Sequence, residues 1–261
     1  MARFSDLGLC LRCLEYSESS QIVTLLTRSH GKARGLAKGA TRLAPSSTAR
    51  FCGGVWPLQL GEATLLQRPG GDLDAVLEWD LLEDHHHLRS DLHAQHMSLA
   101  AAELVDAMLP EADPHPHVFD WLLELLSPRS HGSAMGLVPL LRFQWRLLDA
   151  AGYRPDLDNI GVAEPDEVLS FNPSTGTFSR SDGSPDWRTR GATLRVLRAL
   201  SGERHATPGA VEAALAAPLA GDGLAHRRAA RLLHSYSRTL ADRALPAGAV
   251  ALREPVGPKR S

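Results

Sequence analysis

The first eighty residues alternate between apolar and polar positions with a period of two, which is the pattern of half-buried β-strands. The alternation falls in five short runs that are rich in Leu, Ile, Val and Thr and are separated by turn residues. They are residues 7–14, 20–27, 32–39, 55–68 and 73–79. Five short strands with Gly-rich turns between them predict a small closed barrel.

The third run, KARGLAKG, alternates most sharply. Its odd positions carry only Ala and Gly, and small residues along one face permit the close backbone approach of a narrow barrel. Its even positions carry Lys32, Arg34, Leu36 and Lys38. Side chains two residues apart in a strand share a face, so we expect these three cations to point the same way. His30-Gly31, just before the run, predicts a tight turn in which Gly supplies the positive φ.

From residue 84 the apolar spacing becomes helical, with Leu and Met recurring at i, i+3 and i+4. Asp113 followed by Pro114 has the form of an N-cap with Pro at the first helical position. Gly152 has the form of a C-terminal stop. The predicted helices cover residues 87–109, 118–126, 136–153, 189–201, 207–217 and 224–244.

Three segments interrupt these patterns. Residues 40–51, ATRLAPSSTARF, are polar and rich in Ser and Pro, which predicts a loop. Residues 156–187 are poor in helix formers, and VLSF and TFS around NPSTG predict a small hairpin. The tail from residue 246 is expected to be flexible. We therefore predict a barrel domain at residues 1–80, a helical domain at 81–245 with an insert at 156–187, and a flexible tail at 246–261.

Charge divides the chain more strongly than its net value of −2 indicates. The first fifty residues hold eight basic and three acidic side chains, whereas acids predominate from residue 51 to residue 127. Such a division predicts two modules with different partners, and the partner of the first, basic module is expected to be a polyanion.

Composition narrows the class of protein. The start, MARFSDLGLC, is interrupted by Asp6 and Gly8 and does not resemble a secretory signal. No run reaches the roughly 20 apolar residues of a membrane span. Three cysteines, an odd number, argue against a disulfide framework and favour a reducing cytoplasm.

The stretch TRSHGKARGLAKGA holds four of the cations that we select as candidate DNA contacts, and the following loop adds two more. They are Arg28, Lys32, Arg34, Lys38, Arg42 and Arg50. One interpretation is a solvated strand face whose charges protect a sheet edge. The other is a groove that follows a phosphate backbone through charge, without reading bases. Phe51 and Trp56 are near enough in sequence to stack bases, although a core position is the commoner role for each.

Two other clusters contain residues that can bind metals. Cys10 and Cys13 form a single CxxC inside a strand, where residues three apart point to opposite faces, and this favours two structural cysteines. Asp84 and Asp91 stand among five histidines at the start of a helix, namely His85, His86, His87, His93 and His96. Without an HExxH motif, a solvated helix start explains this cluster better than metal catalysis does.

No motif supplies catalytic machinery. The sequence lacks a nucleophile elbow, a phosphate-binding Gly-Lys-Ser loop and a dinucleotide Gly fingerprint. We therefore predict a protein without enzymatic activity, without a cofactor and without a metal site.

The stretch YSESSQIVTLLTRSHGKARGLAKGATR closely resembles the N-terminal signature of the bacterial RecO family of DNA-repair and recombination mediators. LLDAAGYRPDLD, residues 147–158, is similar to that family's Leu-Gly-Tyr-x-Pro-x-Leu stretch. The resemblance extends over most of the chain, but only the first forty-odd residues are specific. It places the six selected cations, apart from Arg50, on the family's basic hairpin positions. Tyr16, Glu18, Gly31 and Gly39 match signature positions that we interpret as structural.

The resemblance implies an α+β fold, in which an N-terminal OB-fold barrel of five strands binds single- and double-stranded DNA. A helical domain with a small zinc-ribbon-like insert follows. Members of the family anneal complementary strands and help to load recombinase on DNA coated with single-strand-binding protein. Their implied partners are RecR and the C-terminal tail of the single-strand-binding protein, and their implied location is the cytoplasm, at the nucleoid.

The sequence departs from the family pattern in two places. Residues 156–187 contain no cysteine, so the tetrahedral zinc site of many relatives cannot form and we predict an insert held by packing. A basic C-terminal motif of the family is replaced by ADRALPAGAVALREPVG. Two alternatives remain open, a protein-interaction adaptor that does not bind DNA and a metal-dependent hydrolase built on His85 to His96. The oligomeric state is also open.

Overall fold

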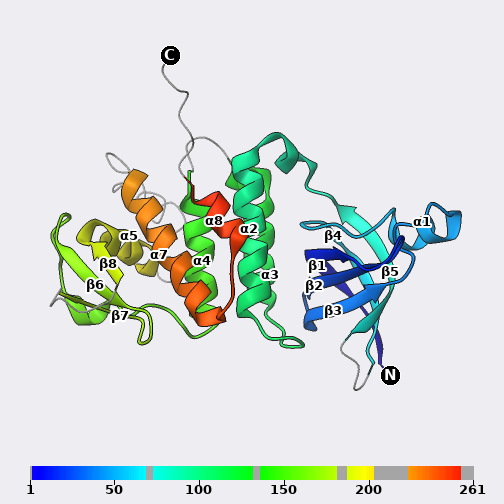
Figure 1. The fold of residues 1–261 in the computed structure, drawn as a ribbon, viewed down its shortest axis with the longest axis horizontal. Coiled ribbons are helices and arrows are strands. Elements are labelled where there is room, and N and C mark those ends of the chain that lie inside the picture. The colour runs from blue at the N-terminus through cyan, green and yellow to red at the C-terminus, as the bar shows by residue number, and fades with distance from the viewer. Residues whose placement is uncertain (1, 69–72, 132–135, 181–186, 203–222, 254–261) are drawn as a thin grey trace, which may run out of the picture. The chain divides into compact units, whose positions relative to one another are not determined.

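The computed structural model describes residues 2–68, 73–131, 136–180, 187–202 and 223–253 (Figure 1). Contacts divide the chain into two compact units, Met1–Ser130 and His131–Ser261. The sequence analysis placed a domain boundary at residue 80, whereas the contacts keep the next two α-helices with the barrel. The α+β class is confirmed, because the described residues form a barrel and three α-helices in the first unit and helices with a small sheet in the second.

The first unit contains the predicted closed barrel of five strands, in the order β1-β2-β3-β5-β4. The strands are β1 (Arg3–Glu15), β2 (Gln21–Thr27), β3 (Gly31–Ala37), β4 (Leu60–Leu66) and β5 (Asp74–Glu83). β3 and β5 pair in parallel, and the other neighbours are antiparallel. The turn before β3 has the expected glycine, because Gly31 has a φ of 76°.

Small residues on β3 face the interior of the barrel, as the alternation predicted. Ala33 and Ala37 lie in a core that includes Val76 and Trp79. A Cβ on Gly35 would lie 2.8 Å from a Val76 methyl group, so a larger residue would not fit without movement. The narrow interior therefore explains the run of Ala and Gly.

A β-bulge interrupts β1 between Cys10 and Arg12. A bulge adds one residue to a strand and shifts the side chains beyond it to the other face. Cys10 and Cys13 consequently both face the barrel core, where Cys10 is buried and Cys13 is partly buried. The expectation that they point to opposite faces was wrong, because it assumed a regular strand.

The loop predicted at residues 40–51 is partly wrong, because helix α1 (Pro45–Phe51) occupies its second half. Pro45 stands at the first helical position, where its missing N–H costs nothing. Phe51 is fully buried in the barrel core. Burial of the Phe51 ring in the barrel core stabilises this short helix, although most of its other residues are polar.

The rest of the first unit consists of η1 (His86–Ser90), α2 (Leu92–Met108), α3 (Pro116–Leu126) and η2 (Pro128–Ser130). Asp91 caps α2 by accepting hydrogen bonds from the backbone N–H groups of His93 and Ala94. The predicted Asp113-Pro114 cap is wrong, because His115-Pro116 begins α3 instead. The Asp113 backbone lies against Gly31, only 2.3 Å from where a Cβ would stand, so this segment packs on the barrel rather than starting a helix.

The second unit contains α4 (Val138–Ala150), η3 (Asp158–Ile160), α5 (Gly191–Ser201), α7 (Gly223–Ala241) and α8 (Pro246–Ala251). Gly152 ends α4 as predicted, with a φ of 79° and hydrogen bonds of a Schellman motif from Gly152 N to Asp149 O and from Tyr153 N to Leu148 O. The helix predicted at residues 207–217 lies outside the described residues. Among the helices that are described, none is long and apolar enough to cross a membrane.

The insert forms a three-stranded antiparallel sheet with the order β7-β6-β8. β6 (Val168–Asn172) and β7 (Thr177–Arg180) are the predicted hairpin, and β8 (Trp187–Arg190) is a third strand that was not predicted. Phe171 packs against Phe178 at 4.8 Å and edge-on against Tyr236 of α7 at 5.1 Å. These aromatic contacts hold the sheet together and against α7 by packing.

The flexible tail predicted from residue 246 instead begins with α8. Leu245, Ala251 and Leu252 are buried, so their burial fixes the segment. Gly248 allows α8 to pack closely against His234 of α7, because a Cβ at residue 248 would lie 2.3 Å from the His234 ring. The last described residue is Arg253.

Gly8 and Gly61 pair across β1 and β4 and both lie near Trp79, so they form a matched test of the barrel interior. We expect Gly61→Ala to reduce the free energy of unfolding by about 1–3 kcal/mol, because its Cβ would lie 2.6 Å from Asp80 O and 2.7 Å from the Trp79 ring. Gly8→Ala meets nothing closer than 3.6 Å and should be neutral or stabilising by up to about 1 kcal/mol. Urea unfolding measures both, and equal effects would contradict this packing.

Candidate nucleic-acid interface

Three rows of outward-facing side chains cross β1, β2 and β3, and the strand register places the members of each row side by side. The first row is Leu9, Leu26 and Lys32. The second is Arg12, Thr24 and Arg34, and the third is Leu14, Ile22 and Leu36. The rows differ in what covers them, and this decides which cations can meet a ligand.

The first row is covered. Leu9 and Leu26 are fully buried outside the barrel core, on the face where β1 packs against α2. Lys32 is only 9% exposed, and its Nζ donates a 2.6 Å hydrogen bond to the backbone oxygen of Asp106 in α2. The Asp106 carboxylate lies 3.7 Å from the same Nζ. Lys32 thus points outward as predicted, but it joins α2 to the barrel instead of facing solvent.

Arg28 also contacts a helix. Its guanidinium forms a 3.0 Å ion pair with Asp120 of α3 and lies 5.9 Å from the centre of the Phe119 ring. The side chain remains about half exposed, so its charge is partly neutralised and partly available. Two of the six selected cations are therefore committed to the helices of their own unit.

The second row is exposed to solvent at both of its ends. Arg12 and Arg34 are exposed, and they flank the small side chain of Thr24. The sequence analysis did not select Arg12, because the bulge that turns it outward gives no signal in the sequence. No hydrogen bond or ion pair holds either guanidinium within the described residues, so both can bind anions.

Lys38 and Arg42 extend this positive surface past the end of β3, and both are exposed. The turn that carries them is fixed against the β1–β2 connection. Gly39 N donates to Ser20 Oγ at 3.1 Å, and Thr41 N donates to Ser19 O at 3.1 Å. The cations after β3 are thus held on a defined backbone, next to the outer face of the sheet.

The two aromatic candidates for base stacking, Phe51 and Trp56, differ in exposure. Phe51 is fully buried in the barrel core, so it cannot stack on a base. Trp56 is 45% exposed, and its indole lies beside Gly54 and Thr41, near the turn that carries Arg42. Arg50 is exposed on α1, where its Nε donates to Ser46 O and its guanidinium lies 5.3 Å from the Phe51 ring.

We use the term barrel face for the exposed and partly exposed residues of these outer rows and the adjoining turn. They are Arg12, Leu14, Ile22, Arg34, Leu36, Lys38 and Arg42. The barrel face has cations on both sides of a short apolar row. This arrangement is complementary to a single nucleic-acid strand, in which the charged phosphate backbone runs beside the flat bases. A hollow of about 320 Å³ at the end of β1 contains Glu15 and Glu18, and their charge disfavours phosphate there.

The histidine cluster does not converge on a metal site. Nδ1 of His85 is bonded to Leu58 O at 2.7 Å, and Nε2 of His87 is bonded to Leu126 O at 2.9 Å, so these rings fasten different elements. His93 is exposed on α2, and His96 is half-buried there. Among the described residues only Glu83, Asp84 and His86 could share an ion, and Asp84 is already paired with Arg89 at 3.2 Å.

Cys10 and Cys13 are poorly suited to redox chemistry. Burial, together with the neighbouring Cys13, raises the pKa of the Cys10 thiol far above its usual range. The pKa of Cys13 is also raised, first by burial and then by Glu15. Because the thiolate is the reactive form, both side chains are structural at neutral pH.

The strand order defines a five-stranded barrel of the OB-fold type, joined to helices. Comparison with known families agrees with this class. The family described as Recombination protein O N terminal matches residues 1–85, and Recombination protein O C terminal matches residues 89–213. The chain therefore belongs to the recombination protein O, or RecO, family.

Curated relatives carry the name DNA repair protein RecO. The protein from Salinibacter ruber is 32% identical over 196 residues, which cover 74% of this chain and 72% of the relative. That from Geobacter sulfurreducens is 37% identical over 65% of this chain and 68% of its own. That from an Anaeromyxobacter species is 34% identical over 65% and 66%. The aligned regions thus span about two thirds of these proteins.

Lys32 and Arg34 are two residues apart on one strand, and they give opposite predictions. We expect Lys32→Met to lower the free energy of unfolding by about 2 kcal/mol, because Asp106 would lose its charged partner in a nearly dry environment. Arg34→Met should change stability by less than about 0.5 kcal/mol. Urea unfolding of both variants checks this, and a stable Lys32→Met protein would show that Lys32 does not join α2 to the barrel.

His85 predicts a pH dependence of stability. Burial lowers its pKa below the ordinary 6.5, so the folded protein binds this proton less readily than the unfolded chain does. The contribution is therefore complete above about pH 6.5 and is lost as the pH falls below that value. In His85→Asn an amide replaces the ring at a φ of 48° that Asn tolerates. We expect a flatter decline of the unfolding free energy below pH 6.5, and an unchanged decline would contradict the assignment.

Proposed function

We propose that this protein binds single- and double-stranded DNA through the barrel face and anneals complementary strands. It acts as a non-catalytic mediator of DNA repair and recombination, which assists recombinase loading on DNA coated with single-strand-binding protein. The observation that carries the proposal is the row of Arg12 and Arg34, continued by Lys38 and Arg42, on one open side of a small barrel. Membership of a family whose relatives are named DNA repair proteins supports it.

The binding mode follows from charge and shape. Exposed guanidinium and ammonium groups attract phosphates and release counterions, and this attraction does not depend on base identity. Leu14 and Leu36 offer flat apolar contact between the cations, and Trp56 offers an exposed ring at the adjoining end. A surface of this kind holds the strand by its backbone and leaves the base edges free to pair.

Annealing uses the same charges. Two complementary strands repel each other through their phosphates, and cations that neutralise part of this charge lower the repulsion. Because the barrel face reads no base edges, Watson–Crick pairing alone selects the partner strand. The protein contributes proximity and charge, and no bond is made or broken by its side chains.

Partner proteins form the less detailed part of the proposal. We propose RecR and the acidic C-terminal tail of single-strand-binding protein as partners, and the cytoplasmic nucleoid as the place of action. The family membership supports these partners, and mixing experiments with each purified protein test them. The barrel face is assigned to DNA alone.

The two alternatives are weaker on specific grounds. A metal-dependent hydrolase is disfavoured because His85 and His87 are bonded to backbone carbonyls of different elements. An adaptor that does not bind DNA leaves unexplained why Arg12 and Arg34 are exposed and form no ion pair in the described first unit. Elemental analysis of the purified protein tests the first alternative, and DNA titration tests the second.

A charge-neutral variant of the barrel face tests the proposal. We expect Arg34→Gln, Lys38→Gln and Arg42→Gln together to weaken binding of a labelled single strand at low salt. The slope of log K against log salt should fall by about two, since each lost phosphate contact removes about 0.7. Fluorescence anisotropy across a salt series measures affinity and slope together.

A matched control removes the same charge from the same unit but outside the barrel face. Its substitutions are Arg3→Gln, Arg89→Gln and Arg129→Gln, all at exposed positions. The control should keep nearly the affinity and slope of the unmodified protein. Equal losses in both triple variants would show that net charge is responsible, and no loss in either would favour the adaptor. Strand annealing with and without single-strand-binding protein then tests the mediator role.

A further inference from the structure

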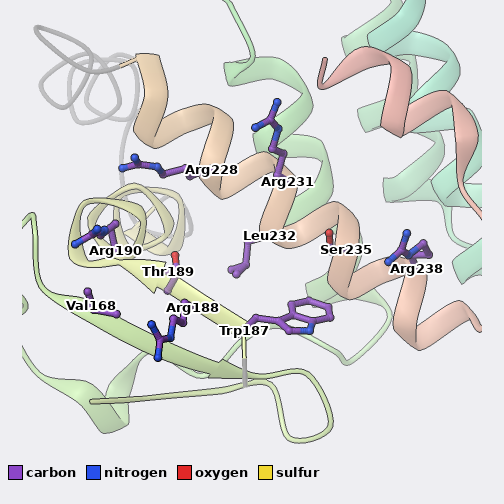
Figure 2. Close-up of a pocket in the computed structure, with 10 residues that line it drawn as sticks. All are labelled: Val168, Trp187, Arg188, Thr189, Arg190, Arg228, Arg231, Leu232, Ser235 and Arg238. Atoms are coloured by element: carbon purple, nitrogen blue, oxygen red, sulfur yellow. The ribbon is translucent and has the colours of Figure 1, made fainter. Parts of the chain in front are cut away.

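The second unit contains an open pocket of about 590 Å³ between strand β8 and helix α7. Five of its ten lining residues are arginines, and none of the lining residues is acidic. The arginines are Arg188, Arg190, Arg228, Arg231 and Arg238 (Figure 2). This concentration of positive charge lies in the helical domain, in which none of the selected cations lies.

The five charges are available to a ligand. All five side chains are exposed, and in the described part of the chain none forms an ion pair with a carboxylate. Arg190 donates to Asp166 O at 2.8 Å, and Arg231 donates to Leu252 O at 3.1 Å. A carbonyl oxygen holds a guanidinium in place without neutralising it. Two of the cations are therefore positioned in advance, and the others can adjust.

The cations line both sides of the pocket. Arg228 and Arg238 are ten residues apart on α7, which corresponds to about 15 Å along a helix axis. Arg188 and Arg190 are two residues apart on β8, so they share a face of the opposite wall. At a rise of about 3.4 Å per nucleotide, this array spans roughly four nucleotides of a stacked strand.

An aromatic ring completes the pocket. Trp187 is half-buried and packs 5.9 Å from the ring of Phe171, so its indole is supported from behind. Leu232 points from α7 toward β8 in the same space (Figure 2). A supported indole with one accessible side is a platform on which a base can stack.

The charge of the whole second unit agrees with this arrangement. Residues 131–261 contain seventeen basic and thirteen acidic side chains, a net charge of +4, so the acidic balance of residues 51–127 does not continue. Five of these basic side chains line the pocket, and none of its lining residues is acidic. The second unit therefore carries a net attraction for polyanions.

We propose that this arginine pocket is a second nucleic-acid site, which holds a single strand by its phosphates and stacks a base on Trp187. An evenly charged polymer suits five cations around one ring better than an acidic peptide does, because a peptide anchor needs a deeper apolar slot than Trp187 and Leu232 provide. The inference rests on the proposed function for its purpose, since annealing brings two strands together and a second site can hold one strand while the barrel face holds the other. Its binding chemistry is independent of the barrel.

The test uses the full chain and two pairs of substitutions. Arg228→Gln with Arg238→Gln removes two pocket charges, and Arg154→Gln with Arg195→Gln removes two exposed charges of the same unit outside the pocket. Each pair is made in the unmodified protein and in the barrel variant Arg34→Gln, Lys38→Gln, Arg42→Gln. The probe is a fluorescein-labelled oligothymidylate, and anisotropy and strand annealing are measured.

We expect the pocket pair to lower the affinity that remains in the barrel variant about tenfold or more, while the control pair changes it less than about twofold. Annealing should fall in the pocket pair even when the barrel is intact. Trp187→Phe keeps a ring and should retain most of the binding, whereas Trp187→Leu should lose part of it. Thermal unfolding of each variant confirms that the fold is kept.

Three results would overturn the inference. Equal affinity of the pocket pair and the control pair would show that the pocket does not hold DNA. Loss of binding for a labelled acidic peptide alone, with oligothymidylate unaffected, would assign the pocket to a protein partner. Equal oligothymidylate affinity of Trp187→Leu and the unmodified protein would show that no base stacks on Trp187. In each case the barrel variant by itself still reports on the proposed function.

Discussion

The interior of the barrel has room for only small side chains along β3, and the arrangement of the outer face depends on this restriction. Gly35 lies against Val76, and Ala33 and Ala37 lie in the same core. A slip of one residue would bring arginine and lysine into this space, at a cost of several kcal/mol for each unpaired charge. Steric exclusion inside the barrel therefore fixes which side chains face outward.

The same register explains why the outward cations have different roles. Along β3 the surface changes from a covered row at Lys32 to an open row at Arg34, because α2 reaches only the first part of the sheet. The bulge in β1 then adds Arg12 to the open row. One strand thus provides both a structural lysine beneath a helix and the cations of a candidate DNA surface.

The sequence was sufficient for the barrel, because alternation and small residues are local signals of strand faces. It was also sufficient for the end of α4 at Gly152, which depends on backbone conformation alone. It could not show that α2 would cover Lys32, since that contact joins residues 74 positions apart. The bulge at Cys10 and the burial of Phe51 likewise depend on tertiary packing.

The arginine pocket shows a similar limit. Arg188 and Arg190 precede α5, and Arg228 and Arg238 lie on α7, so no window of the sequence contains both walls. The charge division seen in the sequence compared residues 1–50 with residues 51–127, and it gave no information on this unit. What the fold adds is the alignment of a short edge strand with one side of a long helix.

The central claim is that DNA lies on the outer face of β1, β2 and β3, and photochemical cross-linking tests this most directly. A single strand substituted with bromodeoxyuridine would be irradiated with the full-length protein, and the cross-linked peptides identified by mass spectrometry. We predict a cross-link at Trp56, which is exposed beside the barrel face, and none within α2 or α3. Cross-links confined to α2 and α3, with Trp56 unmodified, would contradict this placement of the DNA.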